Sequence, residues 1–167
     1  MVDTHPSGST LVDTRPSGST LVDTVPPLGD NRNMADPSVF ALTNFPVHLG
    51  SGATVTRLEE FTGDGDWYER YGEQTAADGV EGRLVSLHTF DGPWPTWEVH
   101  PHGEELVLCT AGIVTPHQDA AGATRTVVLE TGEAIVNPSG VWHTADVTGT
   151  ATALFITAGL GTEIWER

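Results

Sequence analysis

The sequence has one cysteine, no lysine and no long hydrophobic run. With Cys109 alone, an internal disulfide and a cysteine-rich zinc module are both excluded, and its strand-like neighbours predict a buried apolar residue rather than a reactive thiol. No apolar segment approaches the roughly 18 residues of a membrane span. The N-terminus has neither a basic start with an apolar core nor a small-residue cleavage site, so the expected location is the cytoplasm.

Basic charge is also scarce. The chain has 23 acidic residues against 7 basic ones, all arginine, and its formal net charge is −16. Nucleic acids and anionic lipid surfaces need Lys and Arg to neutralise phosphates, so neither a nucleic acid nor a membrane is an expected partner of this acidic protein.

The first 33 residues are a low-complexity segment with a ten-residue period: MVDTHPSGST, LVDTRPSGST and the decaying LVDTVPPLGD. Apolar residues are too sparse there to form a core, so we expect a disordered arm, or an upstream extension of the reading frame without a role. His5 belongs to this arm and is not an expected ligand. Ordinary globular composition begins near Met34, which predicts a single domain over residues 34–167.

The remainder of the chain consists of short β-rich runs separated by Gly, Pro and Asp. The expected strands lie at 53–61, 82–90, 96–100, 105–110, 112–118, 125–130, 133–138, 141–147 and 152–159. One or two helical turns are expected within 66–78, where Gly72 should interrupt them. Many short strands without β-α alternation predict an all-β sandwich or barrel.

The segment WEVHPHGEE, residues 97–105, combines histidines and carboxylates. Pro101 favours an extended backbone at His100, so Glu98 and His100 should lie on one face of a strand. Beyond Pro101 the chain must bend, and His102 need not share that face. Thirty residues later, Gly132, Pro138, Gly140 and His143 form G-x5-P-x-G-x2-H, a strand, tight turn and strand with a histidine just after the turn.

This second pattern resembles the second motif of the cupin superfamily, although Val147 replaces the usual final Asn and Asp146 lies one residue short of it. The first cupin motif, G-x5-H-x-H-x(3 or 4)-E-x6-G, fits in one of two alignments. If His100 and His102 are the H-x-H pair, only two residues separate His102 from Glu105, one too few. The preferred alignment is Gly92-x5-Glu98-x-His100-x4-Glu105-x6-Gly112, in which Glu98 replaces the first histidine.

The resemblance implies a double-stranded β-helix, or jelly-roll barrel, and one divalent transition-metal ion (Mn, Fe, Ni or Zn) inside it. The implied ligands are Glu98, His100, Glu105 and His143. The alternative is that the scaffold persists without metal. His102, Trp142 and His88 are candidates to surround the ligands, and Trp94, Trp97 and Trp142 could stack on a flat substrate at the barrel mouth or pack in a core or dimer interface.

Three functions remain open. The first is a metal-dependent enzyme of dioxygenase, isomerase, decarboxylase or lyase type, acting on a small molecule, with Glu98 or Glu105 as catalytic proton carriers. The second is a non-catalytic small-ligand-binding cupin with a structural metal or none. The third is an acidic structural barrel whose arm recruits a partner. The resemblance also implies a homodimer formed through edge strands.

Overall fold

The computed structural model describes residues 39–120 and 122–167. The predicted N-terminal arm, His5 and the expected domain boundary near Met34 lie outside the described residues. All statements below concern the described part of the chain.

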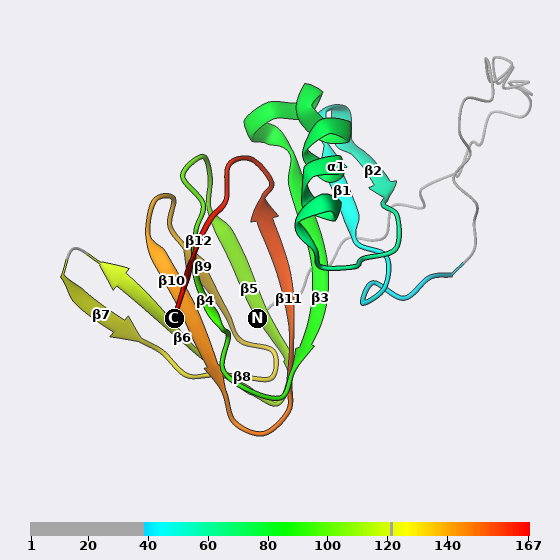
Figure 1. Ribbon diagram of the computed structural model, residues 1–167. Helices are drawn as coiled ribbons and strands as arrows, with labels where there is room; N and C mark the ends of the chain where they lie inside the picture. The colour runs from blue at the N-terminus through cyan, green and yellow to red at the C-terminus, as the bar shows by residue number, and fades with distance from the viewer. Residues whose placement is uncertain (1–38, 121) are drawn as a thin grey trace, which may run out of the picture. The chain divides into compact units, whose positions relative to one another are not determined.

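The fold is built from two antiparallel sheets that face each other (Figure 1). The first sheet has the strand order β2-β1-β3-β11-β5-β9, and the second has the order β12-β4-β10-β6-β7 with β8 paired to β6. The strands of the first sheet are β1 (Val47–Gly50), β2 (Thr54–Arg57), β3 (Arg83–Phe90), β5 (Glu105–Ala111), β9 (Ala134–Asn137) and β11 (Ala151–Ala158). Those of the second are β4 (Thr96–Val99), β6 (Ile113–Ala120), β7 (Ala123–Thr126), β8 (Leu129–Glu130), β10 (Trp142–Val147) and β12 (Glu163–Glu166). The all-β fold class predicted from the sequence is confirmed.

The core lies between the two sheets, as the period-two burial of the long strands shows. Strand β5 buries every second residue from Glu105 to Cys109, and β11 does the same from Ala151 to Phe155. Side chains on one face of a strand share a surface, so these residues converge on a common interior. The buried apolar cluster comprises Trp94, Val107, Cys109, Val114, Leu129, Ile135, Ala145, Ala151, Ala153 and Phe155. Cys109 is fully buried, as expected of an apolar core residue.

A helix packs beside the first sheet and is longer than the sequence suggested. Helix α1 (Gly65–Thr75) begins at Asp64, whose carboxylate accepts a hydrogen bond of 2.8 Å from the backbone N–H of Trp67. Trp67 and Tyr71, one turn apart, are buried in a second small apolar cluster with Leu58 and Leu84. Gly72 does not break the helix, because burial of this face stabilises it. Two short 3-10 segments, η1 (Ser51–Ala53) and η2 (Ala76–Glu81), complete the helical structure, and none of the described helices is long and apolar enough to cross a membrane.

Candidate metal centre

Two rows of polar side chains face each other near one end of the sheets. In the second sheet, the backbone register places Glu98 opposite His143 and His143 opposite Gln118. In the first sheet, Glu105 lies opposite Asn137, and the Thr157 hydroxyl contacts Glu105 from the neighbouring strand. These residues lie at or near the ends of strands β4, β5, β9, β10 and β11. The barrel interior is therefore polar at this end and apolar toward the other.

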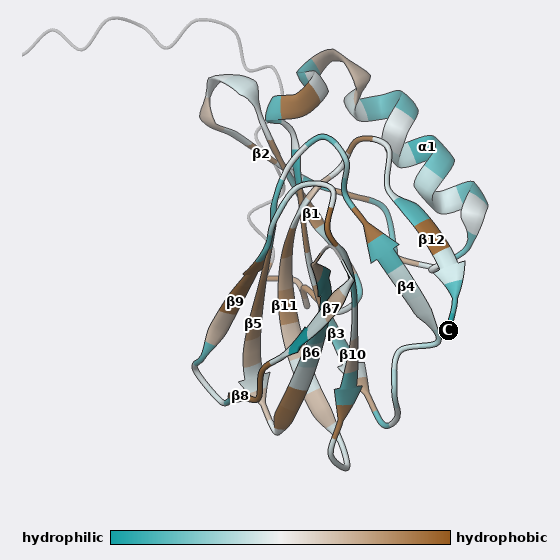
Figure 2. Cartoon of the chain, turned by 90° about the vertical axis from the view of Figure 1, so that its left-hand side faces the viewer, coloured by the Kyte–Doolittle hydropathy of each residue, from teal (hydrophilic) through white to brown (hydrophobic). Residues whose placement is uncertain are grey.

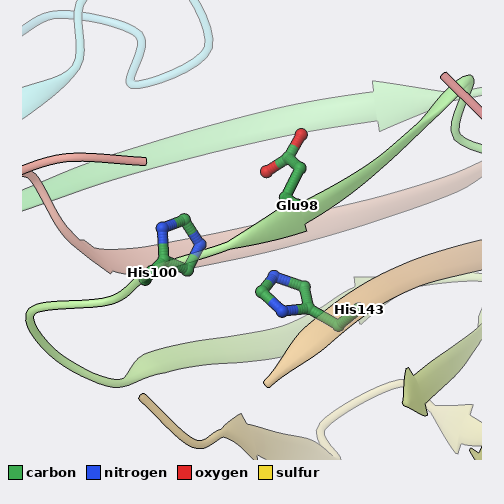
Figure 3. Close-up of side chains that lie close together, drawn as sticks. All are labelled: Glu98, His100 and His143. Atoms are coloured by element: carbon green, nitrogen blue, oxygen red, sulfur yellow. The ribbon is translucent and has the colours of Figure 1, made fainter. Parts of the chain in front are cut away.

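Three potential metal ligands meet in the row of the second sheet. Glu98 and His100 come from β4 and the residue after it, and His143 comes from β10 (Figure 3). One donor atom from each of these three side chains lies within 4.8 Å of the other two. The two histidines are 2% and 1% exposed, and their ring centroids are 5.1 Å apart. The structure thus brings together both motifs in the alignment that places Glu98 before His100.

The second ring nitrogen of each histidine is fixed by a partner outside the cluster. His143 Nδ1 lies 3.0 Å from the carbonyl oxygen of Val141, and His100 Nδ1 lies 2.9 Å from the Thr162 hydroxyl. Because a carbonyl only accepts, His143 Nδ1 carries a proton, and Nε2 of the neutral ring presents a lone pair. Histidine ligands of metals are commonly oriented in this way.

The two Nε2 atoms point into the cluster without a hydrogen-bond partner among the described residues. Glu105 carboxylate oxygens lie 3.4 Å from His100 Nε2 and 3.1 Å from His143 Nε2, but not in hydrogen-bonding alignment. A lone pair facing a carboxylate oxygen at this distance is repulsive unless a metal ion or a proton lies between them. The donor set of two imidazoles and carboxylates therefore fits a divalent transition metal.

Glu105 is held in place by a chain of hydrogen bonds. The Thr157 hydroxyl donates to Oε1 at 2.7 Å, and Asn137 Nδ2 donates to Oε2 at 2.9 Å. Gln118 Nε2 in turn donates to Asn137 Oδ1 at 2.7 Å and to the Val136 carbonyl at 2.9 Å. Each carboxylate oxygen thus keeps a lone pair that can face the histidines.

The acidic groups and His143 have displaced pKa values. Burial alone would raise the pKa of Glu105, but the adjacent histidines outweigh it and hold that pKa well below its usual range. Burial, followed by the charge of Glu105, raises the pKa of Glu98. For His143, burial lowers the pKa, yet contact with Glu105 more than offsets this, so the net shift is upward. One carboxylate is therefore kept ionised while the other holds its proton more strongly.

Three residues expected around the ligands lie elsewhere. His102 is exposed in the turn after β4, beside Gly161, as the preferred alignment anticipates. His88 packs among Phe61, Phe90 and Phe155, with ring centroids 4.9, 6.3 and 5.7 Å away. Trp142 alternates with His143 along β10, which directs it to the opposite face of the sheet. The structure does not bring His88 or Trp142 to the cluster.

The other histidines and tryptophans named from the sequence also lie outside it. His48 contacts Tyr71 and Asp78, and His117 contacts Thr126 and Asp146. Trp94 is buried in the apolar core and does not line the mouth, because it packs against Phe90 and Phe155. Glu104 is exposed, as its position next to the inward-facing Glu105 predicts.

Sequence reasoning missed the supporting residues of the site. The sequence predicted no role for the four residues that fix Glu105 or His100, directly or through a neighbour: Asn137, Gln118, Thr157 and Thr162. Strand alternation offered a signal, because Asn137 shares the inward face of β9 with Ile135. Tyr68 of α1 was also missed. Partial burial, and then the negative charge of Glu98, raises the pKa of Tyr68 to about 12.

The described residues form two facing antiparallel sheets, and the residues of both spaced motifs meet between them. Among solved structures the chain is similar to a cupin-2 domain protein from Shewanella frigidimarina, at 19% identity over 51% of this chain and 71% of that one, with a TM-score of 0.39. A cupin superfamily protein from Desulfitobacterium hafniense is 20% identical over 46% of this chain and 66% of that one, with a TM-score of 0.40. An oxalate decarboxylase is 16% identical over 57% and 26% of the two chains, with a TM-score of 0.46. No protein-family model and no curated protein matches the sequence.

Proposed function

We propose that this protein is a metal-dependent cupin enzyme that acts on a small organic molecule. The observation that supports this most directly is the pair of buried Nε2 atoms, on His100 and His143, that face carboxylate oxygens without a hydrogen bond. Glu98, His100 and His143 hold a divalent ion, with Glu105 as the fourth donor. When bound, such an ion supplies Lewis-acid polarisation of a carbonyl, enol or carboxylate oxygen.

The protein's own groups supply orientation and proton transfer. The bonds from Thr157 and Asn137 fix the Glu105 carboxylate, so its position does not depend on the substrate. Glu98 accepts only a long contact of 3.4 Å from the Thr96 hydroxyl, and its raised pKa favours the protonated form. When it does not coordinate the ion, Glu98 is therefore suited to exchange a proton with a bound molecule.

Metal analysis of protein purified without chelator tests the ligand set. We expect one equivalent of a first-row metal in the unaltered protein and loss of that metal in Glu98→Ala, His100→Ala and His143→Ala. Circular dichroism must show that each variant keeps its fold. A His117→Ala variant is the matched control, because this histidine is bonded on the outer face, and it should retain the ion. Full metal content in all three ligand variants would refute the site.

An enzyme needs a coordination position that a substrate can take. Loading the protein with Co(II) and adding azide or acetate should shift the visible absorption bands, because the added anion enters the coordination sphere. Bands unchanged at saturating anion would mean that protein atoms complete the coordination. That result would favour a structural metal.

One observation favours the alternative of a non-catalytic small-ligand-binding cupin that needs no metal. A proton can occupy the position between His143 Nε2 and Glu105 Oε2, since Glu105 raises the pKa of His143. In that case the metal-free protein would keep its full thermal stability and its ligand affinity. A fall in melting temperature on chelation, reversed by adding metal, would exclude this alternative.

We also propose that the protein forms a homodimer through an edge strand. Among the described residues, β9 is an edge strand of the first sheet and β12 is an edge strand of the second, so each has one side that pairs with no other described strand. Light scattering coupled to gel filtration should give twice the mass of one 17.7 kDa chain. A monomeric mass across the accessible concentration range would contradict this.

A further inference from the structure

Three tryptophans and one aspartate line a hollow on the outer face of the second sheet. The hollow has a volume of about 200 Å³, and its lining residues are Trp97, Asp119, Trp142 and Trp165. Figure 2 looks onto this sheet, in which β12, β4, β10 and β6 lie side by side. Each of these strands contributes one lining residue.

Strand alternation places this hollow on the face opposite the candidate metal centre. Trp97 adjoins Glu98, Trp142 adjoins His143 and Asp119 adjoins Gln118, so each lining residue is next to an inward-facing one. Trp165 lies directly opposite Trp97 in the register of β12 and β4, and Trp142 lies opposite Asp119. The hollow is thus separate from the interior site.

The tryptophan rings offer a large exposed aromatic surface. Trp165 is 63% exposed, and its ring stacks on Trp142 with centroids 4.3 Å apart and an interplanar angle of 27°. An exposed cluster of large aromatic side chains is unusual on a protein surface without a ligand or partner. The aromatic faces carry negative electrostatic potential, which attracts cations.

The charge of the hollow is also negative. Asp119 is the only charged lining residue, and within the described ranges its carboxylate has no hydrogen bond or ion pair. Arg167, which follows β12, is paired with Asp146 at 2.7 Å, and Arg125 lies opposite Gln118, so strand alternation directs it to the other face of the sheet from Asp119. The whole chain carries a formal charge of −16, so a second copy would bring further negative charge to this surface.

We propose that this hollow binds an organic cation with a quaternary ammonium group. The methyl groups would pack against the tryptophan rings, the positive charge would interact with their faces, and Asp119 would neutralise it. A neutral aromatic ligand would leave Asp119 without a partner, and an anion would be repelled. The same chemistry is available from a free choline-like molecule or from a trimethylated lysine in a peptide.

Choline and its uncharged carbon isostere, 3,3-dimethylbutan-1-ol, separate charge from shape. Tryptophan fluorescence should show saturable binding of choline and binding at least about tenfold weaker for the isostere. Trp165→Ala and Asp119→Asn should each weaken choline binding by about tenfold or more. Asp91→Asn removes the same charge at another exposed position and should leave choline binding unchanged. Removing the metal with a chelator should also leave choline binding unchanged. This test therefore does not depend on whether the proposed enzymatic function is correct.

A peptide with one trimethyllysine, compared with the same peptide carrying lysine, distinguishes the two sources of the cation. Tighter binding of the trimethylated peptide than of choline would assign the site to peptides, and the converse to small molecules; both support the proposal. Equal binding of choline and its isostere would overturn it. It would also be overturned if neither choline nor the peptide bound, or if sedimentation showed a dimer that Trp165→Ala abolishes.

Discussion

The backbone N–H of Gly140 donates a 3.1 Å hydrogen bond to the carbonyl oxygen of His100. A second hydrogen bond joins their neighbours in the sequence: the Ser139 hydroxyl donates to the Pro101 carbonyl at 2.9 Å. These bonds join the turns of the two motifs, and neither uses a candidate ligand side chain. Replacing a ligand side chain should therefore leave these two hydrogen bonds intact. Loss of metal in such a variant would then result from the missing donor atom and not from displacement of the turns.

The alignment of the first motif predicts different results for two neighbouring histidines. His100→Ala should lower metal affinity by more than about 100-fold, because it removes a buried donor, whereas altered supporting residues typically cost about 10–100-fold. His102→Ala should bind metal normally, since this side chain is exposed. Competition with a chromogenic chelator measures both. Normal affinity in His100→Ala together with loss in His102→Ala would reverse the assignment.

Replacing a residue that fixes Glu105 should lower metal affinity less than replacing a ligand does. Thr157→Val removes the hydroxyl that donates to Oε1, so we expect metal affinity to fall by about 10–100-fold. Loss of a hydrogen bond to a buried charge should also lower the free energy of unfolding by about 1–3 kcal/mol. Thr89→Val is the matched control, because Thr89 makes an exposed bond to Thr152. Chelator competition and urea denaturation give the two quantities, and equal effects of both variants would contradict the role of Thr157.

Gly112, at the end of the first motif, is required by the backbone. Its φ is +77°, and a Cβ atom there would lie 2.5 Å from the carbonyl oxygen of Thr150. Gly112→Ala should therefore cost more than the roughly 1–2 kcal/mol of a left-handed alanine alone. Gly149→Ala provides that reference, since its φ is +67° and nothing lies within 4 Å. Urea denaturation compares the two, and equal losses would show that the clash is relieved without cost.

The lowered pKa of Asp78 predicts how the free energy of unfolding changes at acid pH. The Ser51 hydroxyl, then the Ser51 backbone N–H, then His48 lower the pKa of Asp78 from 3.8 to about 2. A lowered folded-state pKa stabilises the protein above the ordinary value and loses that stabilisation as the pH falls toward the folded one. Asp78→Asn should therefore weaken the decline in unfolding free energy between about pH 4 and 2. Asp91→Asn, which removes a charge at an exposed position, should retain the decline in urea titrations.

Burial patterns explain which elements the sequence could predict. Strands β5 and β11 bury every second residue over most of their length, which is the pattern that predicts a strand with one buried face. In β3 the sequence does not decide which face is inward, because apolar residues occur on both faces and the buried one includes Ser86. Strand β12 is wholly exposed and is formed by pairing with β4, which leaves no burial signal in its residues. Strand β1, four residues long, was missed as well. Gly72 suggested a break in α1 because propensity alone cannot register the burial of Trp67 and Tyr71.

The site shows a similar division. Extended geometry placed Glu98 and His100 on one face, and motif spacing added Glu105 and His143, all of which the structure brings together. Spacing could not show that Asn137 and Thr157 bond to Glu105, since those contacts join strands distant in sequence. It also did not show that Trp97 and Trp142 gather with Trp165, because their shared outer face depends on the strand order.

Strands β4 and β10 carry a different chemistry on each side, with acid and imidazole inside and indole outside. One residue inserted between Thr96 and Glu98 would turn Trp97 or its neighbour inward and move donor atoms toward solvent. Both surfaces would then be lost in a single event. Evolution or engineering can therefore adjust either face by substitution, but neither by changing the length of these strands.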